Sequence, residues 1–280
     1  MQILSVQGLT KRYERFTLDG VSFSLEPGYI MGFIGRNGAG KTTTLKSMLN
    51  LVHPDGGSVS YFGRDYLQNE FWCKQRLGFM LGGVDYYPRE RIRTIAEVTR
   101  RFYDEWDQKT FADYLDRFEL DPAKRVSELS DGMKVKFSLA LALSHNAELL
   151  ILDEPTSGLD PVSRDDLVEL FQSLIEDGKR SILFSTHITS DLEKCADYIT
   201  YIRRGKIVAS AEKDAFINAY RIVKGEKAAL TDGLKQRLIG IKTHSFGFEA
   251  LMHTEEAESL SGMSVEKADL DSIMIHCDKE

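Results

Sequence analysis

A glycine-rich loop reads Gly35-Arg36-Asn37-Gly38-Ala39-Gly40-Lys41-Thr42 and continues into Thr43. Its spacing, G-x-x-x-x-G-K-T, is the pattern of a loop that wraps a polyphosphate. Such a loop must turn its own N–H groups inward, and glycine reaches the positive φ angles that this requires without steric cost. Lys41 would bring a positive charge to the β- and γ-phosphates, and the Thr42 hydroxyl would ligate Mg²⁺. The loop therefore predicts a site for the phosphates of a nucleotide.

The residues on either side of the loop support this prediction. Residues 29–34 are mostly apolar, as a buried strand should be, and residues 43–51 carry apolar side chains at helical spacing. A strand, a glycine loop and a helix N-terminus together bind anions. The alternative is a glycine-rich turn that matches the pattern by accident, and this context disfavours it.

A second apolar strand, expected at residues 148–152, ends in Asp153 and Glu154. An all-apolar strand is typical of a parallel sheet covered on both faces, and ligands bind at the carboxyl edge of such sheets. Asp153 would contact Mg²⁺ there, and Glu154 would accept a proton from the attacking water or position it. The alternative, a strand followed by an acidic helix cap, is disfavoured by the phosphate loop upstream.

Three further positions could complete the site. His187 follows a strand expected at residues 181–185, where it could hydrogen-bond the γ-phosphate and the water. Ser130 and Gly132 precede a helix expected at residues 132–144 and suggest a second anion site at its N-terminus. One such site per nucleotide is enough, so this one either serves another ligand or completes the site of another copy.

Tyr13 lies between two strands expected at residues 3–9 and 16–25, upstream of the loop. An aromatic side chain in this place could stack on a nucleotide base. It could equally be an aromatic residue at a strand edge, and the local sequence leaves the two interpretations open.

Composition limits the class of protein. The chain has 280 residues, a net charge of −7 and an isoelectric point of about 5.5. An acidic chain disfavours nucleic acid as the partner, because phosphate backbones bind concentrated Lys and Arg. No apolar run approaches the roughly 18–20 residues of a membrane helix, and the N-terminus lacks the pattern of a signal peptide. Three widely spaced cysteines are expected to be reduced thiols.

The pattern along the chain changes twice. Helical stripes occupy residues 94–103, 108–118 and 132–144, so that a helical segment from about 85 to 145 interrupts an α/β pattern. Beyond residue 220 the pattern thins into a small α/β accessory domain, residues 221–280. There we expect helices at 235–239 and 255–260 and strands at 246–252 and 272–276.

The motifs occur in a characteristic order, at residues 35–42, 129–133, 151–154, 157–160 and 185–187. Together they resemble the ATP-binding subunit of a bacterial ABC transporter, over residues 2–220. The resemblance implies an α/β fold with a P-loop NTPase core, an antiparallel β subdomain and an inserted helical subdomain. It makes residues 1–220 the ATP-binding domain and 221–280 a small α+β accessory domain.

The resemblance also implies how the residues act. Such subunits hydrolyse ATP with Mg²⁺ and form head-to-tail dimers, here of two identical or two related chains, that sandwich two ATP molecules. The signature residues Ser130, Asp131, Gly132 and Met133 would face the ATP held by the other copy, with Asp160 across the interface. Tyr13 matches the aromatic that stacks on adenine and His187 the switch histidine. A separate transmembrane permease would hold the subunit on the cytoplasmic face of the membrane.

Two departures from the family pattern stand out. The signature reads Leu-Ser-Asp-Gly-Met where Leu-Ser-Gly-Gly-Gln is usual, although its two phosphate-facing positions, Ser130 and Gly132, are kept. The family places a glutamine after the strand expected at residues 77–81, and this chain has Gly82-Gly83 there. Asp85 could replace the glutamine, or no side chain does.

A narrower resemblance concerns residues 102–107, 129–134 and 184–192, which are similar to ABC-2-type subunits of exporters. It implies small amphipathic peptides or antimicrobials as cargo. Two other functions stay open: a soluble ABC ATPase that does not transport, and a weakly active regulatory subunit that binds ATP. The single signature and the acidic charge disfavour the soluble ATPase. Glu154 disfavours the regulatory subunit, whereas the missing glutamine favours it.

Overall fold

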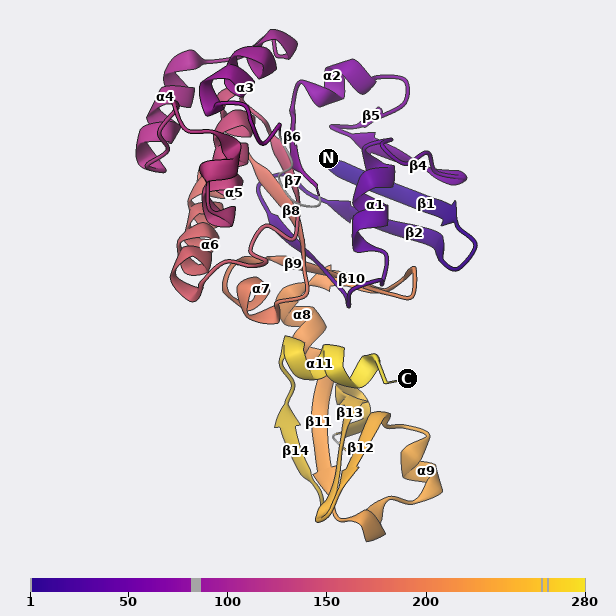
Figure 1. Cartoon of the computed structure of the whole chain (residues 1–280). Coiled ribbons are helices and arrows are strands. Elements are labelled where there is room, and N and C mark those ends of the chain that lie inside the picture. Colours follow the sequence, from indigo (N-terminus) through magenta and orange to yellow (C-terminus); the bar gives the residue numbers. More distant parts are fainter. Residues whose placement is uncertain (1, 82–86, 258, 261, 280) are drawn as a thin grey trace.

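The computed structural model describes residues 2–81, 87–257, 259–260 and 262–279. Its strands form three sheets, and the third, C-terminal sheet stands apart from the other two at one end of the molecule (Figure 1). None of the helices in these residues is both long and apolar enough to span a membrane.

The central sheet has six strands in the order β10-β9-β3-β8-β7-β6. All neighbours pair in parallel except β9 and β10. Every residue of β3, β7 and β8 is buried, which explains their apolar sequences. The strands are β3 (Ile30–Ile34), β6 (Leu77–Met80), β7 (Leu149–Asp153), β8 (Ser181–Thr186), β9 (Tyr198–Arg203) and β10 (Lys206–Glu212).

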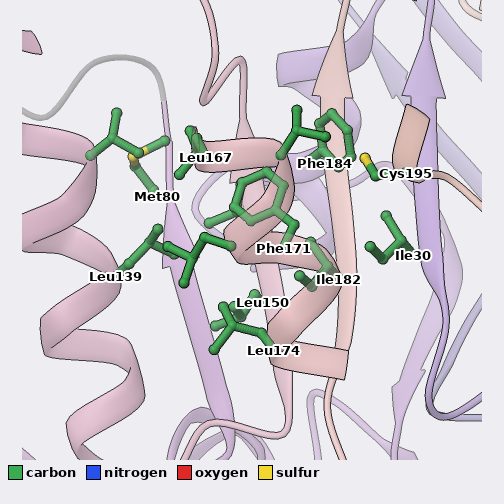
Figure 2. Packing of buried hydrophobic residues seen from close by; sticks show 14 of the residues in the cluster. Ile30, Met80, Leu139, Leu150, Leu167, Phe171, Leu174, Ile182, Phe184 and Cys195 are labelled. Carbon is green, nitrogen blue, oxygen red and sulfur yellow. The ribbon is translucent and has the colours of Figure 1, made fainter. Parts of the chain in front are cut away.

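One face of this sheet is covered by α6 (Pro161–Ile175) and α7 (Thr189–Cys195). Phe171 of α6 lies on the strands beside Ile182 and Phe184 of β8, as Figure 2 shows. The alternate residues of the same strands point to the other face, so the sheet divides the core into two layers.

The other face packs against α1 (Lys41–Met48) and a four-stranded antiparallel sheet in the order β2-β1-β4-β5. Leu45 and Met48 of α1 are fully buried between the two sheets. The helix that begins at the glycine loop is therefore held on both sides. The strands are β1 (Leu4–Arg12), β2 (Thr17–Leu25), β4 (Gly56–Tyr61) and β5 (Arg64–Asp65).

The segment between β6 and β7 is helical, and it projects to one side of the central sheet (Figure 1). Its helices have apolar faces that join the main core. Side chains of Asp107 and Ser130 cap α4 and α5. The elements are α3 (Ile92–Thr99), η1 (Arg100–Phe102), α4 (Gln108–Arg117), η2 (Val126–Glu128) and α5 (Asp131–Ser144), and α2 (Glu70–Lys74) precedes β6.

The C-terminal segment follows α8 (Lys213–Asn218) and forms an antiparallel sheet in the order β12-β13-β11-β14. One face of the sheet has a small core of its own, and α11 covers the other. The elements are β11 (Tyr220–Gly225), η3 (Lys227–Ala229), α9 (Asp232–Lys235), β12 (Ile239–His244), β13 (Gly247–His253), α10 (Thr254–Ala257), β14 (Ser264–Lys267) and α11 (Leu270–Cys277).

Two sequence predictions for this segment are wrong. Residues 272–276 form part of helix α11 and not a strand, and residues 235–239 join the end of α9 to the start of β12. A short apolar run such as Ile273-Met274-Ile275 suits either a helix or a strand. The Asp269 side chain decides for the helix, because it accepts from the Ser272 N–H at 2.7 Å and caps α11. The strand expected at 246–252 is confirmed by β13, and the helix expected at 255–260 is the shorter α10.

Candidate active site

The glycine loop joins β3 to α1, and its glycines meet two different demands. Gly38 and Gly40 have φ angles of 81° and 115°. A Cβ atom at Gly40 would also lie 2.9 Å from the Phe16 ring, and one at Gly35 would lie 2.4 Å from the Ile202 carbonyl oxygen. Glycine is therefore needed at Gly38 for the turn, at Gly35 for close packing and at Gly40 for both. The loop lines a cavity of about 480 Å³.

Lys41 is buried at the first turn of α1 with its ammonium group fully engaged. The Nζ atom donates to the carbonyl oxygen of Gly35 at 2.7 Å and lies 3.4 Å from that of Arg36. It also forms an ion pair with Glu154, 3.0 Å from Oε1. A cation held by carbonyls and one carboxylate can pass to a stronger anion, such as a phosphate, with little movement.

Glu154 follows β7 with a left-handed backbone, φ 51°. A non-glycine residue pays for this conformation and keeps it only where its surroundings enforce it. Its N–H donates to both the carbonyl oxygen and the hydroxyl of Ser185, each at 3.1 Å, which ties the turn to β8. Glu154 Oε2 lies 2.8 Å from His187 Nδ1. The structure thus brings Lys41, Glu154 and His187 into one connected chain.

Thr42 and Asp153 form the second pair of the site. The Thr42 hydroxyl donates to Asp153 Oδ2 at 2.8 Å, and Ser185 donates to Oδ1 at 2.5 Å. A hydroxyl and a carboxylate side by side are hard oxygen ligands, the type that Mg²⁺ prefers beside substrate phosphates. No cluster of three or more acidic, histidine or cysteine side chains suited to a metal occurs in the described part of the chain. The pair fits an ion that is held partly by the nucleotide.

The cavity has a further wall that the motifs did not predict. Arg15 and Phe16 line it, together with Arg36, Asn37 and Thr43 of the loop. Arg15 and Phe16 come from the turn between β1 and β2, where the Tyr13 N–H donates to the Phe16 carbonyl oxygen at 2.8 Å. Tyr13 itself is about half exposed, and its stacking on adenine stays a prediction. In the sequence, only the position of this turn upstream of the loop could have indicated that Arg15 and Phe16 line the cavity.

The signature residues lie at another hollow, of about 160 Å³, which Ser130, Gly132 and Met133 line together with Leu159 and Ser163. Ser130 accepts from the Met133 N–H at 3.3 Å and so caps α5. Asp131 pairs with Lys134 at 2.8 Å on the surface. Within one copy the signature and the phosphate loop thus line separate cavities.

Asp160 caps α6 in the same region. It accepts from the Ser163 hydroxyl at 2.6 Å and from the N–H groups of Val162 and Ser163 at 3.0 and 3.1 Å. The bond from the Ser163 hydroxyl is the main reason that the pKa of Asp160 is lowered. Its role across a dimer interface stays a prediction. Gly82, Gly83 and Asp85 lie outside the described residues.

Known proteins are similar to this chain in sequence and in fold. The family described as "ABC transporter" matches residues 18–157. The bacitracin transport ATP-binding protein BcrA of Bacillus licheniformis is 33% identical over 209 residues, which cover 74% of this chain and 68% of that protein. The chain belongs to the ABC transporter ATP-binding family. The resemblance to ATP-binding subunits is thereby confirmed, and the protein is an ATPase that uses ATP with Mg²⁺.

Other ABC proteins are also similar to this chain in sequence or fold. Nod factor export ATP-binding protein I of Burkholderia orbicola is 34% identical over 243 residues, 82% of this chain and 80% of that protein. An ATP-binding subunit of an ABC transporter has a TM-score of 0.68 at 25% identity, covering 76% of this chain and 91% of that structure. A dimeric ATP-binding cassette bound to ADP and Pi shares the fold, with a TM-score of 0.66 at 19% identity over 75% of this chain and 98% of that one. The expected α/β P-loop fold is confirmed.

Proposed function

We propose that this ABC ATPase powers a separate transmembrane permease that exports small amphipathic molecules, with peptide antimicrobials as the leading class. The observation that carries its catalytic part is the chain of contacts from Lys41 through Glu154 to His187, beside the Thr42–Asp153 pair. These five residues come from three segments of the sequence and meet at one edge of the central sheet.

The contacts suggest how binding prepares hydrolysis. Incoming phosphates attract Lys41 and draw it away from Glu154. The released carboxylate can then accept a proton from a water, while His187 keeps it oriented through the 2.8 Å contact. Bound Mg²⁺ would neutralise charge on the phosphate oxygens, held by Thr42 and Asp153. Binding and water activation thus use different groups.

The separation of the signature hollow from the phosphate loop supports a dimer. Ser130 and Gly132 present the N-terminus of the 14-residue helix α5, which favours an anion. In a head-to-tail pair this end would face the γ-phosphate bound by Lys41 of the other copy. The partner would be a second copy of this chain or a related subunit.

A surface beside β6 suits a membrane partner. Three apolar side chains are exposed there: Leu67 before α2 (63%), Phe71 in α2 (69%) and Phe102 of η1 (67%). Gln75 joins the two elements by donating to the Phe102 carbonyl oxygen at 2.7 Å. We take these exposed apolar side chains as the contact surface for the permease. Through it the protein would sit peripherally on the cytoplasmic face of the membrane.

The names of the relatives support the direction and class of cargo. One is named as a bacitracin transport ATP-binding protein, and another as a Nod factor export ATP-binding protein. To test the proposal, the tagged protein is purified from detergent-solubilised membranes. We expect a multispanning protein to copurify in a fixed ratio, and a double variant Phe71→Ser with Phe102→Ser to lose it. Recovery of the protein alone, or with ribosomes, would favour the soluble ATPase.

A further inference from the structure

Helix α11, the last helix in the described residues, lies between the C-terminal sheet and the ATPase core (Figure 1). Its apolar residues Leu270, Ile273 and Cys277 are buried in the same cluster as the core of the central sheet. The helix is therefore packed on the ATPase, and its two ends reach different parts of the active site.

The first end contacts the segment that carries the switch histidine. Asp271 Oδ1 accepts from the Thr189 hydroxyl at 3.0 Å, and Glu193 of α7 accepts from the Leu270 N–H at 3.1 Å. Thr189 is buried and lies only two residues after His187. Asp271 thus fixes the start of α7, from which the chain leads directly back to His187 and its contact with Glu154.

The second end contacts the phosphate loop. Asp278, just after α11, forms an ion pair with Arg36, and Arg203 at the end of β9 donates to the Cys277 carbonyl oxygen. The carbonyl oxygen of Arg36 lies 3.4 Å from Lys41 Nζ. The ion pair with Asp278 therefore restrains a residue whose backbone carbonyl helps to hold Lys41.

We propose that α11 positions both halves of the ATP site, with Asp278 acting through Arg36 on the phosphate loop and Asp271 acting through Thr189 on His187. Both carboxylates are positioning residues, since neither lies against the cavity that the loop forms. The inference rests on the roles proposed above for Lys41 and His187. It gives the accessory domain a direct function in ATP turnover.

The two contacts predict different kinetic effects. Asp271→Ala removes the acceptor of the Thr189 hydroxyl, so kcat should fall at least threefold while KM for ATP stays within twofold. Asp271→Asn keeps an acceptor oxygen and should restore kcat. Asp278→Asn removes the charge opposite Arg36 and should raise KM about threefold with little change in kcat, a modest effect because the Arg36 side chain is 72% exposed.

The matched control is Asp232→Asn, which breaks a surface pair with Lys235 on the same domain, at α9. Its kcat and KM should equal those of the wild type. A double variant of Arg36→Gln with Asp278→Asn should raise KM no further than Arg36→Gln alone, because the partner is already gone. Steady-state ATP turnover of the intact chain measures all of these variants.

The inference is overturned if Asp271→Ala keeps kcat within twofold of the wild type, if Asp278→Asn keeps KM within twofold, or if Asp271→Asn is as slow as Asp271→Ala. Failure of the proposed function would look different, because Glu154→Gln would then hydrolyse ATP as fast as the wild type.

Discussion

At the scale of single residues, Lys41 and Glu154 neutralise each other across 3.0 Å, with 5% and 23% of their side chains exposed. Lys41 is the buried member of the pair, and a buried cation without a partner has a large cost in solvation free energy. The pair therefore keeps a lysine and a carboxylate ready inside the site, and ATP would exchange one anion for another at Lys41.

Lys41→Ala should weaken ATP binding at least tenfold, because it removes the buried cation that faces the phosphates. Isothermal titration with Mg-ATP measures the affinity. Lys46→Ala, on the same helix, is the control and should bind ATP as the wild type does. An unchanged affinity in Lys41→Ala would show that this loop does not bind the phosphates of ATP.

Sequence motifs predicted the residue types and their order well, since loop chemistry demands particular residues at particular spacings. They could not predict the left-handed φ of Glu154, which depends on its bonds to Ser185 on another strand. Nor could they predict Phe16 as a wall of the cavity, because that contact depends on how the β1–β2 turn meets the loop.

At the scale of elements, His145 fixes the end of α5 against the residues that lead into β6. Its ring stacks on Tyr103 with centroids 3.7 Å apart, and its Nδ1 lies 3.3 Å from the Gln75 carbonyl oxygen. Burial lowers the pKa of His145 from 6.5 to about 4. The neutral ring is thus part of the packing between helical segment and sheet.

This pKa predicts a pH dependence of stability. Between pH 6.5 and about 4 the unfolded chain binds a proton at His145 that the folded chain does not, so the stabilisation is present above pH 6.5 and is lost as pH falls. From pH 7 to pH 5 the loss should be about 1–2 kcal/mol. His145→Phe keeps a ring but does not titrate, so its denaturation midpoint in urea should depend less on pH. Equal slopes for both proteins would contradict the assignment.

Strands and helices could be predicted from the sequence where the pattern of apolar residues extends over many positions. The buried strands of the central sheet read as apolar runs, and the helices of residues 92–144 as stripes. The C-terminal elements are short, and their type depends on packing: α11 is a helix because Asp269 caps it and because the core accepts Leu270 and Ile273 on one face. Such tertiary reasons are absent from a local pattern.

At the scale of the whole molecule, Gly240 lets the C-terminal sheet approach α11. Its φ is +59°, and a Cβ atom there would lie 1.9 Å from the His276 carbonyl oxygen. Gly240→Ala should destabilise the packing of the C-terminal sheet on α11 by about 2 kcal/mol or more. Gly233→Ala in α9, where a Cβ atom meets nothing within 4 Å, should be tolerated. Urea denaturation compares the two, and equal stability would show that α11 is not held as described.

The signature and the phosphate loop line two separate cavities within one copy, so under the proposed function one copy would hold only part of a hydrolytic site. We infer that ATP completes the site by joining two copies. Glu154→Gln is suited to the test, because it should bind ATP but lack the carboxylate that activates water.

The decisive measurement is size-exclusion chromatography of Glu154→Gln with light scattering, in Mg-ATP and in Mg-ADP, with the nucleotide content of each peak. We expect a dimer with two intact ATP molecules in Mg-ATP and a monomer in Mg-ADP. A monomer that retains intact ATP would show that ATP does not join two copies.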